Sequence, residues 1–225
     1  MIPYDPNQAL ISLHIPKTAG TSFRAVLQAW FGEGLHDHYP DHGKPLGGVA
    51  LGPGVCIHGH FNRDKGLGVQ DCYPQARQFI TVLREPFARM ISLWLFLNRE
   101  QAAGRTQAVA GFADFDAWFG HHRDAALANP AAGFLRNFPM PVTPEGVPTL
   151  FDRDFVAVGI TERMQETVDH LARALGRPTI AIGRDNVSPE DAGPFQRYRA
   201  EHERVFHLEH ALYAEGLRRF DQAAR

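Results

Sequence analysis

Residues 9–31, ALISLHIPKTAGTSFRAVLQAWF, combine a short apolar run, a polar turn and an amphipathic segment. The run from Ala9 to Ile15 is typical of a buried strand, and the apolar residues after the turn recur at helical spacing. Between them, residues 16–22 supply a lysine, two threonines, a serine and a glycine. This order predicts a strand, a tight loop and a helix that starts near Thr21 or Ser22.

The same alternation of short apolar runs and amphipathic segments continues along the chain. Further strands are expected at residues 54–58, 78–84, 154–160 and 178–182, and helices after Pro86, after Thr161 as N-cap, within 112–119, and over 195–220 with one break. Residues 32–54 are expected to form a loop, and most of 99–152 carries no clear pattern. Such alternation predicts an α/β fold, with a doubly wound, mainly parallel sheet and helices on both faces.

Composition limits the classes of function. A chain of 225 residues with 44% hydrophobic and 21% charged residues suits one globular domain spanning 1–225. A formal charge of -2 does not favour nucleic acid or a membrane surface as a partner. The chain contains no leader pattern and no apolar stretch long enough to span a bilayer, so a cytoplasmic protein is expected. Cys56 and Cys72 have no metal or redox spacing and are expected to stay reduced. No sequence signal bears on the oligomeric state.

The loop at residues 16–22 is suited to an anion. In the expected geometry, the N–H groups of the turn and of the helix N-terminus point outward together. Lys17 adds a positive charge, and the hydroxyls of Thr18, Thr21 and Ser22 add donors. A simple capped helix needs only one such hydroxyl, so this alternative is disfavoured. The lysine precedes the glycine, which departs from the Walker A order of ordinary P-loop ATPases.

The order Pro-Lys-Thr-x-Gly-Thr-Ser resembles the 5'-phosphosulfate loop of sulfotransferases that use 3'-phosphoadenosine 5'-phosphosulfate (PAPS). The stretch LREPFARMISLW, residues 83–94, is similar to the 3'-phosphate motif of the same family, with Arg84 after a strand and Ser92 in the following helix. Two such sites fit a ligand with phosphate at both ends. Glu85 and Arg89 leave a surface ion pair open as another role for Arg89.

The resemblance extends to other blocks. Residues 155–175, 184–188 and 210–220 look like segments of the heparan 2-O-sulfotransferase-like carbohydrate sulfotransferases, although His210 stands where an acid is common. Asn186 and Ser188 are weak candidates for further cofactor contacts. Residues 32–54 and 99–152 match poorly, which suggests that they bind the acceptor.

The sequence CIHGHF places His58 and His60 at the expected end of a strand. A neutral imidazole can act as a base near neutral pH, although a histidine at a strand end can also merely bond a carbonyl. The family has a similar His-Gly-His, whose second histidine is taken as the base. The resemblance therefore implies His60 as the catalytic base, His58 as its support and Lys17 as the group that stabilises the leaving phosphate.

Together these features imply a P-loop-like sulfotransferase fold and transfer of a sulfuryl group from PAPS to an acceptor hydroxyl on a glycan or a small molecule. The family resemblance favours a carbohydrate hydroxyl. PAPS would leave as adenosine 3',5'-bisphosphate. The implied cofactor-binding residues are Lys17, Thr18, Ala19, Gly20, Thr21, Ser22, Arg84 and Ser92. Residues that could line a sugar or anionic site are Trp94, Trp118, His121, His122, Arg123 and Arg136.

Three alternatives remain at this point. A non-catalytic nucleotide-binding module would keep both phosphate motifs, and a phosphotransferase with an unusual loop would need magnesium and ATP. A zinc site would draw on the histidine-rich segments, but their spacing lacks the helical H-E-x-x-H pattern, so no metal is expected. Its candidate ligands would be His36, Asp37, His38, His42, His58 and His60.

Overall fold

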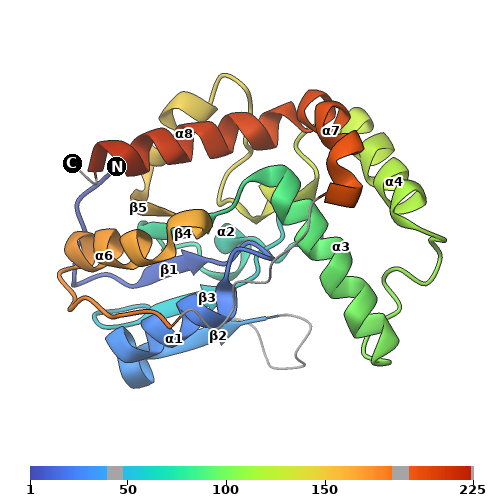
Figure 1. Ribbon diagram of the computed structural model, residues 1–225. Helices are drawn as coiled ribbons and strands as arrows, with labels where there is room; N and C mark the ends of the chain where they lie inside the picture. Colours follow the sequence, from blue (N-terminus) through green and yellow to red (C-terminus); the bar gives the residue numbers. More distant parts are fainter. Residues whose placement is uncertain (40–47, 184–192, 224–225) are drawn as a thin grey trace.

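The computed structural model describes residues 1–39, 48–183 and 193–223, and its centre is a sheet of five parallel strands (Figure 1). The strand order is β2-β3-β1-β4-β5, and every neighbouring pair is parallel. The central strands β3, β1 and β4 are buried along their whole length, as expected for a parallel sheet that is covered on both faces. The strands are β1 (Leu10–Leu13), β2 (Leu35–His38), β3 (Cys56–Gly59), β4 (Phe79–Leu83) and β5 (Phe155–Ile160).

Helices cover both faces of this sheet, which confirms the predicted α/β class (Figure 1). On one face, α1 and α6 bury Trp30 and Leu171 against Ile80. On the other face, α8 buries Leu212 and Phe220 in a second apolar cluster with strand residues. The helices are α1 (Gly20–Phe31), α2 (Val69–Cys72), α3 (Pro86–Ala102), α4 (Phe115–Ala128), α5 (Leu150–Arg153), α6 (Met164–Leu175), α7 (Arg199–Val205) and α8 (His207–Ala223).

A third apolar cluster lies where α3, α4 and α7 meet, to the right of the sheet in Figure 1. Its centre is aromatic: the ring of Phe115 lies 4.9 Å from that of Tyr198 and 5.8 Å from that of Trp94. Residues 99–152, which showed no clear sequence pattern, thus include α4, a short 3-10 helix at Gly133–Asn137 and α5. Residues of α4 and of this 3-10 helix lie beside the carboxyl ends of the strands, whereas α5 leads into the amino end of β5.

The expected loop at residues 32–54 contains the edge strand β2, which the sequence pattern does not predict. The sequence of β2, LHDH, has no alternating or continuous apolar pattern. Its order comes from parallel pairing with β3 and from a bidentate contact, in which Arg24 on α1 donates to both carboxylate oxygens of Asp37 at 2.8 and 2.7 Å.

The strand expected at residues 178–182 is wrong, because side chains rather than another strand bind its backbone. The indole of Trp30 donates to the carbonyl of Pro178 at 2.9 Å. The amide of Gln165 donates to the carbonyl of Ile180 and accepts from the N–H of Ile182. The segment is therefore an extended connection that packs beside α6.

The expected N-cap at Thr161 is also wrong, since a 3-10 turn at Thr161–Arg163 leads into α6 without a side-chain cap. Thr167 instead binds both backbone groups of Ile160, at 2.7 and 2.8 Å. The predicted break in the last helical segment is confirmed at Phe206, between α7 and α8.

The block at 184–188, with Asn186 and Ser188, lies outside the described residues. Within the described parts of the chain, no helix is both long enough and apolar enough to cross a bilayer.

Candidate active site

The residues singled out in the sequence gather at the carboxyl edge of the sheet. The loop at residues 14–19 follows β1, His60 follows β3, and Arg84 follows β4. Because β1 lies between β3 and β4, these three ends are adjacent. In open parallel sheets this edge is where ligands bind.

The loop between β1 and α1 has an unusual backbone. Lys17 and Ala19 both have positive φ, at 73° and 59°. Such a conformation costs an L-residue about 1 to 3 kcal/mol, and it persists where the surrounding structure fixes it. Ala19 is the N-cap of α1 and has no side chain that could cap it, and no acidic residue lies in the first turn. The N–H groups at the start of α1 are therefore open to an external anion.

Of the three hydroxyls expected in this loop, that of Thr18 has a different role. Thr18 is 2% exposed, and its hydroxyl donates to the carbonyl of Ile15 at 2.9 Å. A hydroxyl has one proton to donate, so this one stabilises the turn and is not the anion donor predicted from the sequence. Thr21 is exposed and Ser22 is half-buried, so those two lie at the surface of the site.

Lys17 and Arg84 bring the two predicted phosphate motifs together. The Nη1 of Arg84 donates to the carbonyl of Lys17 at 3.2 Å, so this side chain crosses from the end of β4 to the loop after β1. The ammonium of Lys17 lies 4.2 Å above the ring of Phe96 on α3. Lys17, which follows β1, and Arg84, which follows β4, thus place two cationic groups at the carboxyl edge of the sheet.

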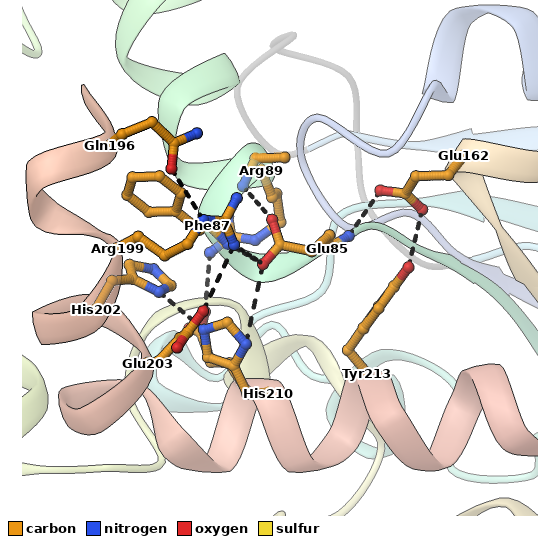
Figure 2. A network of polar contacts seen from close by, with 12 residues as sticks. Glu85, Phe87, Arg89, Glu162, Gln196, Arg199, His202, Glu203, His210 and Tyr213 are labelled. Carbon is orange, nitrogen blue, oxygen red and sulfur yellow. Dashed lines mark hydrogen bonds and ion pairs between the residues drawn. The ribbon is translucent and has the colours of Figure 1, made fainter. Parts of the chain in front are cut away.

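The N-terminus of α3, unlike that of α1, is occupied. The carboxylate of Glu85 accepts from the N–H groups of Phe87 and Ala88 at 3.3 and 2.7 Å. The same carboxylate lies 3.3 Å from Nη1 of Arg199 and 4.0 Å from Nδ1 of His210, as Figure 2 shows. A phosphate near this turn would thus depend on side chains and not on the helix end.

Further bonds hold the turn after Arg84 from the other side. One oxygen of Glu162 accepts from the backbone N–H of Glu85 at 2.8 Å, and the other accepts from the hydroxyl of Tyr213 at 3.2 Å (Figure 2). The position of Arg84 is therefore fixed by α7 and α8 as well as by β4.

Ser92 and Arg89 are both buried in α3, at 4% and 6% exposure. Arg89 does not take part in the surface ion pair considered with Glu85. Its Nη2 instead donates to Glu209 on α8 at 3.3 Å, and both side chains are buried. Ser92, eight residues after Arg84, is thus inside the protein and not at the surface of the site.

Three histidines form a stack at the ends of β1 and β3. The ring of His14 lies 5.1 Å from that of His58, nearly parallel to it, and 4.6 Å from that of His60. The Nδ1 of His58 lies 2.9 Å from the hydroxyl of Ser12. His58 is 1% exposed and does not line the cavity that His60 borders, so of the two candidate bases His60 is the better placed for a substrate.

His14 was not assigned a role from the sequence, yet it lies at the centre of this site. Its Nδ1 is 2.9 Å from the hydroxyl of Tyr39, and its ring covers Gly20 so closely that a Cβ at Gly20 would be 1.9 Å from Nε2. Burial, with His58, His60 and Lys17 adding to it, holds the pKa of His14 well below its usual value. His14 belongs to the site because β1 pairs with β3 in parallel. This pairing could be used only if the strand order were already known from the sequence.

We expect the free energy of unfolding to fall as the pH is lowered, in part because of His58. Burial lowers the pKa of His58 to about 3, so between that value and the ordinary 6.5 only the unfolded chain takes up the proton. By linkage, this one group removes about 2 kcal/mol of stability between about pH 7.5 and about pH 5. Urea unfolding of His58→Asn should show a shallower pH dependence than the wild type. Equal slopes would contradict the assignment.

The zinc alternative draws no support from the geometry. Among the described residues, no group of three or more His, Cys, Asp or Glu side chains is arranged to hold a metal ion. Asp37 is bound by Arg24, and Nδ1 of His38 lies 3.2 Å from the hydroxyl of Tyr73. His42 lies outside the described residues.

A cavity of about 500 Å³ opens beside His60 and Pro16. Four of the six side chains suggested for an acceptor site line it: Trp118, His121, His122 and Arg136. Trp94 instead packs against Trp118 with ring centres 5.4 Å apart, and Arg123 donates to Asp124. The cavity therefore adjoins both the loop after β1 and the candidate base.

Comparison with known proteins adds a likeness in structure. A scan against protein-family models found no match, and a search of the curated proteins found no similar sequence. One similar solved structure is a sulfotransferase from Alicyclobacillus acidocaldarius. The two chains are 15% identical with a TM-score of 0.49, and the match covers 99% of this chain and 100% of the other. At that level of similarity, the function has to be argued from the site itself.

Proposed function

We propose that the chain is a single-domain, PAPS-dependent O-sulfotransferase. The observation that carries the proposal is the junction of two anion-binding features at one sheet edge. These are the uncapped N-terminus of α1 and the Arg84 side chain, which reaches the carbonyl of Lys17. A ligand with separate phosphate groups matches this pair, and the motif resemblance supports PAPS.

The main-chain donors from Ala19 to Ser22 would hold the 5'-phosphosulfate, and Arg84 would hold the 3'-phosphate with Ser92 behind it. This arrangement fits the charge of the ligand, since α1 has no acidic residue in its first turn. The N-terminus of α3 contributes nothing, because Glu85 already caps it. The 3'-phosphate therefore depends mainly on one guanidinium.

When bound, PAPS supplies a sulfur atom whose bond to the 5'-phosphate oxygen can break. In the proposed step, His60 takes the proton from the acceptor hydroxyl as the acceptor oxygen forms its bond to sulfur. The electron pair of the broken S–O bond stays on the leaving phosphate, and Lys17 stabilises that charge. His14 and His58 hold the ring of His60 in place through the stack described above.

The proposal predicts selective binding of adenosine 3',5'-bisphosphate. Calorimetric titration should give a lower Kd for this nucleotide than for ADP, or for ATP with magnesium. Loss of a charge-assisted bond should weaken binding by about 10-fold or more in Arg84→Ala. Arg77→Ala, which removes an exposed arginine that bonds Pro74, is the matched control and should bind as the wild type does.

Each other outcome has a defined meaning. Preference for ATP with magnesium, together with chelator-sensitive transfer, would favour a phosphotransferase. Tight binding of the bisphosphate with no transfer to any hydroxyl would favour a non-catalytic binding module. Indifference to the 3'-phosphate would overturn the proposal.

A further inference from the structure

The cavity beside His60 has a composition that bears on the acceptor. Its walls come from the α3, α4 and α8 side of the molecule and from the 3-10 helix at Gly133–Asn137. Most of the lining is apolar, with Met90, Leu93, Phe134 and Phe206 among the larger side chains. Its volume lies in the range of sites for small molecules, about 300 to 1,000 Å³.

Two of the cationic side chains that line the cavity have acidic partners. Arg89 and Glu209 pair with each other, and Arg136 lies 3.5 Å from Asp64. A second carboxylate or a sulfate placed against Arg89 would therefore lie near the Glu209 carboxylate and be repelled. Lys65 also lines the cavity, so the argument against an anionic group applies to the position beside Arg89 and not to the whole lining.

Arg89 also leaves one donor unused. Its Nε is buried and has no hydrogen-bond partner among the described residues. The guanidinium is held in place by Glu209 and by the ring of Phe134, 4.4 Å away. A buried donor without a partner costs free energy, which a bound ligand with an acceptor oxygen would recover.

From these observations we infer that the cavity binds a compact, largely apolar alcohol or phenol that carries a neutral acceptor oxygen for Arg89. The hydroxyl faces His60, and the second oxygen faces the buried guanidinium. This inference rests on the proposed function, and it replaces the carbohydrate acceptor that the family resemblance implies. A sugar ring, with hydroxyls on most of its carbons, would leave many of them against carbon atoms.

The test uses 4-hydroxybenzophenone as the probe, with binding followed by calorimetry in the absence of nucleotide. 4-Benzylphenol, which has CH₂ in place of the carbonyl, is the matched ligand and should bind about 10-fold more weakly. Methyl glucuronide, an anionic sugar, should bind more weakly than either phenol. Equal affinity for the two phenols, or preference for the glucuronide, would overturn the inference.

A pair of variants locates the binding site. Ala125 is an exposed residue of α4 that lines the cavity, and Ala128 is an exposed residue of the same helix outside the lining. Ala125→Trp should lower the affinity for the probe at least about 10-fold, because the indole fills part of the cavity, and Ala128→Trp should not. Equal effects of the two would place the probe elsewhere and refute the assignment.

These results separate the inference from the function on which it rests. Both variants should keep the wild-type affinity for adenosine 3',5'-bisphosphate. Binding of the bisphosphate without binding of the phenol would refute the acceptor class alone. Binding of the phenol without the bisphosphate would refute the sulfotransferase proposal and leave the cavity as a ligand site.

Discussion

Replacing His60 with alanine is expected to lower kcat by about 10² to 10⁴-fold, the usual contribution of a general base. Affinity for adenosine 3',5'-bisphosphate should stay near the wild-type value, because the main-chain donors of α1 and the Arg84 side chain are unchanged. The expected pattern is thus a loss of turnover with cofactor binding intact. Single-turnover transfer from PAPS and calorimetry on the same preparations measure the two quantities.

The control for this variant is His207→Ala, which removes an exposed histidine at the start of α8. It should leave both turnover and bisphosphate affinity unchanged. Wild-type turnover in His60→Ala would mean that another group takes the proton. A parallel loss of turnover and of affinity would mean that His60 acts by holding the loop after β1 and not as a base.

A second large effect is expected from one added methyl group, in Gly20→Ala. The new Cβ would lie 1.9, 2.1 and 2.7 Å from three atoms of the His14 ring, so the ring or the loop must move. Tyr39 and His58 hold that ring, which makes its displacement costly. We expect bisphosphate affinity to fall at least about 10-fold and the melting temperature to fall as well.

Helix propensity alone predicts the opposite sign, since alanine inside a helix is favoured over glycine by about 1 kcal/mol. Gly111→Ala is the matched control, because nothing lies within 4 Å of a Cβ built there. The double variant Gly20→Ala, His14→Ala removes the clash and should regain part of the lost affinity. A Gly20→Ala protein that is more stable and binds normally would show that His14 does not pack on the loop in solution.

The sequence was sufficient to predict the strands, loops and helices that have a clear local pattern of apolar residues. The loop at 16–22 lies between an apolar run and an amphipathic helix, so its place at a strand end followed from local spacing. Arg84 and His60 also follow apolar runs, and the alternation of runs and helices fixed the parallel sheet. These predictions needed no knowledge of which strands are neighbours.

The features that were missed depend on tertiary contacts. β2 is ordered by its neighbours and by the Arg24–Asp37 pair, while Ile180 and its neighbours are bound by the Gln165 side chain in place of a strand. His14 belongs to the site only because β1 and β3 are adjacent. Composition and periodicity contain no information about such long-range pairings.

Helix α8 supports both parts of the proposed site, the nucleotide-binding edge of the sheet and the acceptor cavity. Its Glu209 holds Arg89 at the cavity, while its His210 and Tyr213 face the two glutamates that fix the turn after Arg84 (Figure 2). A small shift of α8 would therefore change the contacts of both the nucleotide and the acceptor. If binding at one site moves α8, the affinity at the other site changes as well, and linkage requires that effect to be reciprocal.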